Sequence, residues 1–231
     1  MEIKKIHLPD RLRPDLTRPA RPPEPRWPVV VALLAVSGLN LALPSSISPG
    51  PDWLLLVIVA ALAGPAILLH HLRRYKVAMF LGFSALGVVT LAMVTSLGLL
   101  IRALLLHKEQ PAQMLLSAVL LWTSNILVFA TWYWRLDAGG PAQRDLQGAH
   151  TDGAFLFPQM VLDPALREQM GEQDWRPGFI DYLFLAFNTS TAFSPTDVPV
   201  LSRWAKVLMM LQASISLATL ALLAARAVNI L

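Results

Sequence analysis

A group of hydroxyl, amide and carboxylate side chains interrupts the apolar second half of the sequence. Its members are Asp181, Asn188, Thr189, Ser190, Thr191, Ser194, Thr196 and Asp197. Oxygen atoms of this kind can replace part of the hydration shell of a cation or of another small solute. Asp181 and Asp197 bracket the group, and an acid at the mouth of a cavity attracts cations. The residue types therefore predict an ion or solute path.

Three more polar residues follow in the apolar segment 207–231. Gln212, Ser216 and Thr219 fall near one line at helical spacing. In a channel this line would face water, while small residues on the opposite side would pack against a neighbouring helix. Those small residues are Ser214, Ala218, Ala221 and Ala225. In the alternative interpretation, the hydroxyl groups donate hydrogen bonds to the backbone of their own helix.

The sequence contains none of the motifs that mark common catalytic or cofactor sites. It has no glycine-rich phosphate loop, no cluster of His or acidic residues at metal-ligand spacing, and no Gly-x-Ser-x-Gly turn. The absence of cysteine excludes disulfides and thiolate metal sites. We therefore expect a protein that is not an enzyme, with no catalytic residues, no cofactor and no metal.

Long apolar segments must position these polar residues. The chain has 231 residues, of which 55% are hydrophobic and 15% are charged. Charged residues make up about a quarter of an ordinary soluble domain, so this composition favours a membrane protein. A membrane-spanning helix needs about 20 mostly apolar residues. Five spans are predicted, at residues 28–43, 53–69, 77–101, 114–134 and 207–231.

Four regions follow from this pattern, and together they predict an all-α, polytopic transmembrane protein. Residues 1–26 are rich in proline and arginine and are expected to form a disordered arm. Residues 27–136 form a membrane region of four helices, and residues 137–176 form an acidic extramembrane connection. Within this connection, the sequence GAFLFP (153–158) is apolar enough to lie on the membrane surface or to dock against a helix. Residues 177–231 combine the polar group with the closing helix.

Residues 179–194 allow three interpretations. They could form a re-entrant pore helix followed by a loop, since backbone exposed at membrane depth must be buried in protein or line water. They could form a short sixth span, although their length is slightly below the usual minimum. Their hydroxyl groups could instead cap and pack helices. We favour the re-entrant interpretation.

Basic residues predict the orientation of the chain. They are concentrated in residues 1–26, and Arg73, Arg74 and Lys76 fill the second connection. The positive-inside rule places both segments in the cytoplasm, together with the N-terminus and the acidic connection. The net charge of +4 is modest, and its uneven distribution favours a role in topology over binding of nucleic acid. We expect a multi-pass protein of the bacterial inner membrane.

The segment from Asp181 to Asp197, followed by a long apolar helix, resembles the pore module of tetrameric potassium-type channels. In that module a pore helix ends in a Thr-rich turn, a glycine-containing filter and an Asp, and an inner helix follows. Residues 191–197 (Thr-Ala-Phe-Ser-Pro-Thr-Asp) occupy the place of the filter, but both filter glycines are missing. Because Pro195 cannot take the backbone freedom of glycine, this departure argues against a carbonyl filter selective for potassium.

A second resemblance covers more of the chain. Its length and four leading spans, the aromatic pattern of residues 122–133, the GAFLFP sequence and residues 181–198 are similar to a family of small bacterial multi-pass membrane proteins of unknown function. This resemblance implies a fold and a location, and it carries no activity and no catalytic residues.

These observations lead to one favoured function and one alternative. We expect a pore-loop, channel-like protein that forms a homo-oligomer in the lipid bilayer and passes small cations or other small solutes. The alternative is a structural or regulatory membrane protein that does not conduct and binds a partner through the acidic connection.

Overall fold

The computed structural model describes residues 23–72, 74–106, 110–147, 150, 152–194 and 197–227. This part of the chain is helical, apart from loops and one isolated antiparallel bridge between Phe155 and Val200. The expected all-α fold class is therefore confirmed. The helices are α1 (Trp27–Leu41), α2 (Leu54–His71), α3 (Tyr75–Leu106), α4 (Pro111–Leu136), η2 (Asp137–Gly139), α5 (Pro141–Gln147), α6 (Pro158–Val161), α7 (Pro164–Gln169), α8 (Phe179–Ala192) and α9 (Arg203–Ala227).

Three of the described helices are long and apolar enough to cross a membrane. They are Tyr75–Leu106 with 32 residues, Pro111–Gly139 with 29 and Arg203–Ala224 with 22. The apolar helices Trp27–Leu41 and Leu54–Leu69 are shorter. The molecule is thus compatible with a membrane protein that has at least these three crossings, and the expectation of five spans stays a prediction.

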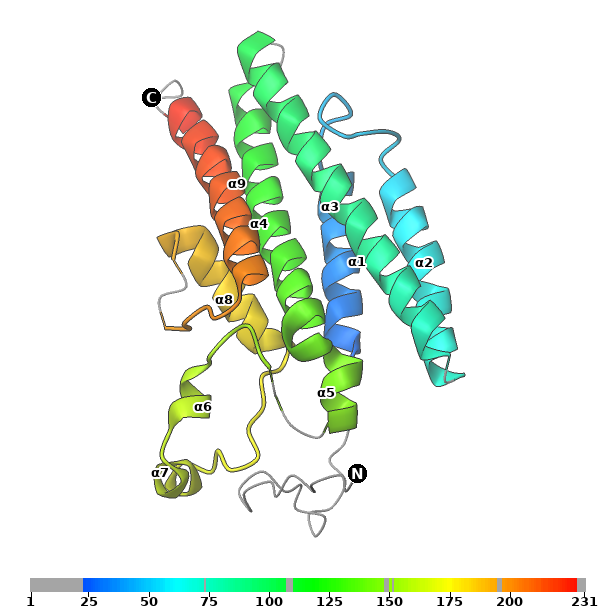
Figure 1. Cartoon of the computed structure of the whole chain (residues 1–231). Helices are drawn as coiled ribbons and strands as arrows, with labels where there is room; N and C mark the ends of the chain where they lie inside the picture. Colours follow the sequence, from blue (N-terminus) through cyan, green and yellow to red (C-terminus); the bar gives the residue numbers. More distant parts are fainter. Residues whose placement is uncertain are drawn as a thin grey trace, which may run out of the picture.

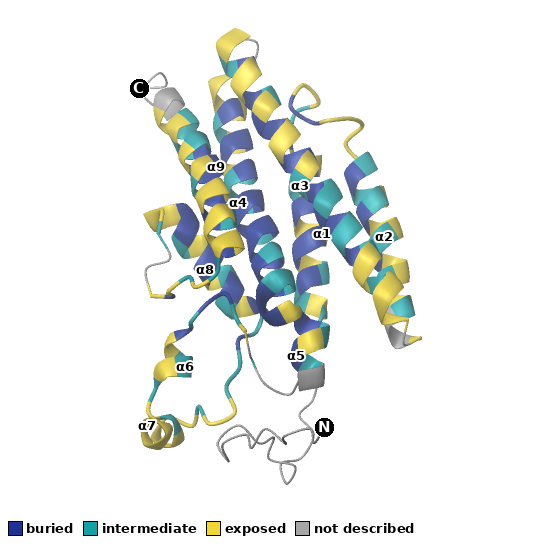
Figure 2. Ribbon diagram, viewed as in Figure 1, coloured by how far each residue is buried: buried dark blue, intermediate teal, exposed yellow. Residues whose placement is uncertain are grey.

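α4 forms the centre of the molecule, because its neighbours surround it. α1 and α3 pack on one side of α4, α8 and α9 pack on the other side, and α2 lies outside α1 and α3 (Figure 1). Of the apolar 18-residue stretch within each helix, 61% is buried in α4, 39% in α3 and 28% in α9. Figure 2 shows the same contrast between buried and exposed residues. α3 and α9 therefore each keep a large exposed apolar surface, which suits contact with lipid or with a second protein chain.

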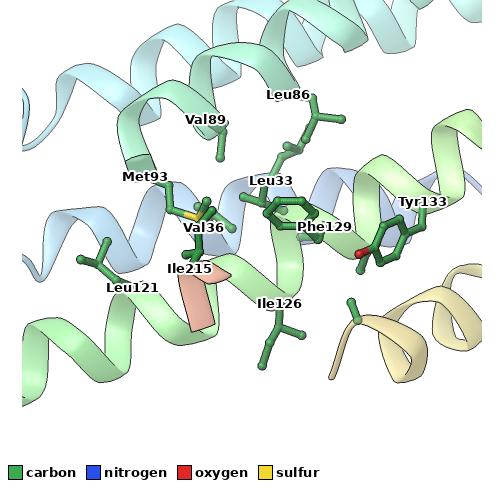
Figure 3. Packing of buried hydrophobic residues seen from close by; sticks show 14 of the residues in the cluster. Leu33, Val36, Leu86, Val89, Met93, Leu121, Ile126, Phe129, Tyr133 and Ile215 are labelled. Atoms are coloured by element: carbon green, nitrogen blue, oxygen red, sulfur yellow. The ribbon is translucent and has the colours of Figure 1, made fainter. Parts of the chain in front are cut away.

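The two sides of α4 are packed with different kinds of side chain. Between α1, α3 and α4 the interior consists of apolar residues that interdigitate (Figure 3). Its labelled members include Leu33, Val36, Leu86, Val89, Met93 and Phe129. Between α4, α8 and α9 the interior carries several buried polar residues. This second interface contains five of the residues that the sequence singles out, namely Thr189, Ser190, Gln212, Ser216 and Thr219.

The sequence GAFLFP docks against the helix bundle, which confirms the second of its two expected placements. Phe155 and Phe157 are 1% and 3% exposed. The ring of Phe155 contacts Tyr133 of α4, Tyr182 of α8 and Trp204 of α9, with centroids 5.2–6.2 Å apart. These aromatic side chains therefore belong to the packed body of the molecule.

The fold makes the predicted orientation testable with single cysteines, since the chain has none of its own. Ser46 follows α1, and Gln169 ends α7 beyond the opposite end of the bundle (Figure 1); both are exposed. In intact cells we expect a membrane-impermeant thiol reagent to label Ser46→Cys and to spare Gln169→Cys, because the positive-inside rule predicts a cytoplasmic N-terminal end. Labelling of Gln169→Cys alone would reverse the orientation.

Candidate functional site

α8 lies beside α4 and runs antiparallel to it. The ring of Phe179, at the start of α8, lies 6.4 Å from that of Trp134 near the end of α4. The ring of Phe187, two turns later, lies 6.2 Å from that of Trp122, which is earlier in α4. α8 therefore rises from the end of the bundle where α4 ends and points toward the middle of the bundle.

After α8 the chain returns to the end of the bundle from which it came. Residues 199–201 pair with residues 154–156, through Leu156 N–H to Pro199 O (3.0 Å) and Leu201 N–H to Ala154 O (2.8 Å). The backbone N–H of Ala154 also donates to Asp137 Oδ1, and Tyr182 in the first turn of α8 donates to Asp137 Oδ2 (2.7 Å). The start of α8 and the end of the return loop are thus joined at one place.

Hydrogen bonds fix how far α8 reaches along α9. Gln212 Nε2 donates to Ser190 Oγ (2.8 Å) and to Ala186 O (2.7 Å), and Ser216 Oγ donates to Ser190 O (3.0 Å). With a rise of about 1.5 Å per residue, Gln212 and Ser216 lie about 14 and 20 Å along α9 from its start. The tip of α8 therefore lies opposite the middle of α9.

The tip of α8 is exposed on the surface of the single chain. Thr191, Ala192 and Phe193 are exposed, and Phe193 ends the helix with a positive φ of 54°. A bulky residue in this left-handed conformation is uncommon, and glycine would adopt it without steric cost. The loop therefore turns sharply without the glycines that potassium-type filters use.

The structure divides the predicted site residues into two groups. Five are buried between helices: Thr189, Ser190, Gln212, Ser216 and Thr219. Four lie at the surface of the hairpin formed by α8 and its return loop, either exposed or half-buried: Asn188, Thr191, Ser194 and Asp197. Thr196 lies outside the described residues. The polar line on α9 thus faces the interior of the chain, and its small residues Ser214 and Ala221 are exposed.

Asp181 lies at the start of α8 and stabilises that helix end. Its Oδ2 accepts a hydrogen bond of 2.7 Å from the backbone N–H of Gly178, as expected for an acid near a helix N-terminus. Burial raises the pKa of the Asp181 carboxyl above its usual range, while the backbone N–H groups of Gly178 and Asp181 oppose that rise. Asp181 thus has a structural task, and it stands beside the point where α8 enters the bundle.

Gln212 is the centre of the buried polar cluster between α4, α8 and α9. Besides its two donated bonds to α8, its Oε1 accepts a hydrogen bond from the hydroxyl of Tyr133, and its carbonyl oxygen accepts one from Asn125 Nδ2 (3.2 Å). Asn125 on α4 is therefore joined to α9 by an interhelical hydrogen bond. Both polar atoms of the Gln212 side chain have partners within the chain, so the cluster fastens α8 and α9 to α4.

A second buried network, which involves charged groups, lies where α4 ends. Glu24 receives hydrogen bonds from Trp134 Nε1 and from the guanidinium of Arg144, with Arg144 Nη2 to Glu24 Oε2 at 2.9 Å. Arg144 Nη1 also donates to the carbonyl oxygens of Trp134 (3.0 Å) and Asp137 (2.7 Å). His150 Nε2 lies 3.0 Å from Asp137 Oδ2, at an angle outside hydrogen-bond geometry. The network fixes Asp137, and therefore the origin of α8.

The network corrects one expected boundary. The predicted arm ends at Arg26, yet Glu24 is 4% exposed and Arg26 Nη2 pairs with Asp145 Oδ2 at 2.8 Å. The disordered arm therefore cannot extend to Arg26, because Glu24 and Arg26 anchor residues 23–26 to the body. The rest of the expected arm, residues 1–22, lies outside the described residues.

Sequence reasoning missed Glu24, Asp137, Arg144 and Tyr133. Glu24 and Arg144 are 120 positions apart, and no local pattern joins them. Asp137 offered the best signal, because it directly follows the aromatic run Trp132-Tyr133-Trp134 at the end of an apolar segment. An acid at such a position must find partners once the helix end is buried.

The described residues hold no group of three or more His, Cys, Asp or Glu side chains that could bind a metal ion. Comparison with protein families, with curated proteins and with solved structures gives no match for this chain.

The Glu24–Arg144 pair leads to a stability prediction. Both side chains are at most 6% exposed, so Glu24→Gln leaves the charge of Arg144 buried without its counter-charge. Removing one partner of a buried pair costs about 3–5 kcal/mol, so the unfolding midpoint of the purified protein in detergent should fall clearly. Glu168→Gln, at an exposed position on α7, should leave the midpoint within experimental error. Equal midpoints for both variants would show that the pair is dispensable.

A pair of deletions tests the same anchor. Removal of residues 1–19 keeps Glu24 and Arg26, so the folded yield and unfolding midpoint should stay close to those of the full chain. Removal of residues 1–24 takes away Glu24 and should lower both. If the shorter deletion already lowers the folded yield, residues before Pro23 also contribute to stability.

Proposed function

We propose that this chain is an integral protein of the bacterial inner membrane in which α8 and its return loop form a pore loop. Copies of the chain would assemble so that these loops line a path for small cations or other small solutes. No chemical step and no cofactor is part of this proposal. The observation that carries it is the hairpin path of residues 178–201, which leaves and rejoins the same end of the bundle.

The apolar helices support a polytopic arrangement. α3, α4 and α9 are each long enough to cross the bilayer, and we assign α1 and α2 as two further, shorter spans. The basic residues before α1 and between α2 and α3 favour a cytoplasmic N-terminus. In this arrangement the tip of α8 lies near the middle of the membrane, because it faces the middle of α9.

Lipid cannot cover the tip of α8 at that depth. Irregular backbone inside a membrane is tolerated only where protein buries it or water reaches it, and residues 193–194 are non-helical and partly exposed. A second copy of the chain or a water-filled path must therefore cover the loop. This requirement supports an oligomer with the loops near its centre.

The exposed hydroxyl of Thr191 is suited to contact with a cation. Its O–H donates to the carbonyl oxygen of Phe187 (3.0 Å), so its lone pairs are directed away from that bond. Asn188 adds a half-buried amide one turn earlier, and Asp197 adds an exposed carboxylate on the return loop. These are oxygen ligands of the kind that replace ion hydration, placed on the same hairpin.

The exposed side of α9 offers a surface on which copies could meet. Ser214 and Ala221 are exposed there and Ala218 is half-buried, which would allow a neighbouring helix to approach closely. This is the packing role expected for the small-residue stripe. In the proposed assembly, α9 therefore contributes contacts between copies and α8 contributes the polar path.

A second candidate function rests on a different surface. Val161, Leu166 and Met170 in the α6–α7 segment are 64%, 43% and 59% exposed, outside the helices that could cross a membrane. Exposed apolar side chains on an extramembrane segment favour contact with a partner protein. In this alternative the chain does not conduct, and the acidic connection holds a partner.

Reconstituted protein should distinguish the two functions by flux across liposomes. We expect the wild-type protein to pass monovalent cations and Thr191→Val to reduce that flux several-fold, because the substitution keeps the side-chain shape and removes the oxygen that faces the path. Asp197→Asn should lower the preference for cations over anions more than it lowers assembly.

Matched variants show whether a loss of flux comes from a change in the solute path or from a folding defect. Thr123→Val removes a hydroxyl that makes the same type of bond to its own helix on α4, and it should leave flux unchanged. Thr189→Val changes a buried hydroxyl and should affect stability without a specific loss of flux. Absence of flux in the wild-type protein under varied voltage, pH and ion composition would remove the pore and leave partner binding as the proposal.

A further inference from the structure

Arg135 carries a charge that no carboxylate among the described residues balances. It lies in the last turn of α4, and its guanidinium stands over the ring of Phe83 on α3, 5.4 Å from the centroid. Its Nε is buried without a hydrogen-bond partner. Among the described residues no carboxylate forms an ion pair with it.

The neighbouring carboxylates already have other partners. Glu24 pairs with Arg144, and Asp145 pairs with Arg26 (2.8 Å) and lies 3.6 Å from Arg176. Arg26 adds a second positive charge to the surroundings of Arg135, and its Nε is also buried without a hydrogen-bond partner. Two adjacent arginines therefore each keep a donor group that the described part of the chain leaves unsatisfied.

Gly82 makes room for the guanidinium of Arg135. A Cβ atom at Gly82 would overlap Nη1, Nη2 and Cζ of Arg135, whereas a Cβ at Gly87, on the same helix, would meet nothing within 4 Å. Because residue 82 has no side chain, the guanidinium of Arg135 can pack against α3 at this position. Arg135 as a whole is half-buried, but its Nε is buried without a partner, and an unsatisfied buried donor is costly, so this placement points to a bound anion.

We propose that Arg135 and Arg26 form a binding site for the phosphate group of an anionic phospholipid. A guanidinium matches phosphate with two parallel hydrogen bonds, and cavities with basic side chains between helix ends suit lipid headgroups. The site lies beside exposed aromatic residues of the type found at membrane interfaces, with Trp27 at 68% and Phe80 at 70% exposure. It rests on the proposed membrane location and is independent of the pore.

Lipid titration of the full-length protein in detergent tests the site. Short-chain phosphatidylglycerol should raise the unfolding midpoint in a saturable way, and phosphatidylcholine should raise it less. Arg135→Gln and Gly82→Ala should each weaken the apparent affinity for phosphatidylglycerol about tenfold, the loss expected for a charge-assisted hydrogen bond. Gly82→Ala is the sharper variant, because it displaces the guanidinium and leaves the net charge unchanged.

Two controls and a second anion decide the interpretation. Gly87→Ala and Arg102→Gln, the latter at the opposite end of α3, should bind phosphatidylglycerol as the wild-type protein does. If Gly82→Ala does not fold, Arg135→Lys provides the comparison, since it keeps the charge and loses the planar group.

Equal responses to both lipids, or equal losses in Gly82→Ala and Gly87→Ala, would overturn the proposal. An equal rise with inorganic phosphate alone would assign the site to a soluble anion instead. Flux measurements do not enter this test, so the pore and the lipid site can fail separately.

Discussion

The buried carboxylate of Asp137 accepts hydrogen bonds from the backbone N–H of Ala154 and from the hydroxyl of Tyr182. One oxygen atom thereby holds the segment that pairs with the return loop, and the other holds the first turn of α8. Arg144 binds the carbonyl oxygen of the same residue and brings Glu24 with it. The position of the α8 hairpin depends on this junction, since it joins the first turn of α8 to the segment that pairs with the return loop.

The two interfaces of α4 reflect different physical needs. α1 and α3 are held by apolar packing over their length, in which many small dispersion contacts add up. α8 is short, and its other face bears exposed apolar residues such as Ile180 and Phe184. Hydrogen bonds from Gln212 and Ser216 supply a directional contact at its far end. Inside an apolar environment such bonds resist exchange with water, so a few of them can set the depth of a helix.

The proposed pore loop and the proposed lipid site lie on opposite sides of α4 and use polar groups in opposite ways. In the α8 hairpin, the buried groups satisfy one another, and the exposed groups Asn188, Thr191 and Asp197 are left for a solute or a second copy. At Arg135, the buried Nε lacks a hydrogen-bond partner among the described residues. In both places the single chain is incomplete, and the missing element would come from the membrane or from another copy.

The sequence by itself determined the helical class, the approximate positions of the apolar helices and the polar group of residues 181–197. These follow from local signals, namely apolar run length, helical periodicity and prolines at the first helical positions of α1 and α4. It also gave docking against a helix as one of two placements for GAFLFP. Only the tertiary structure decided that Gln212, Ser216 and Thr219 face the interior, that residues 23–26 belong to the body, and that Glu24 pairs with Arg144 across 120 residues. The physical reason is that spacing along one helix fixes which residues share a face, whereas the burial of that face and the partners of its charges depend on how separate helices pack.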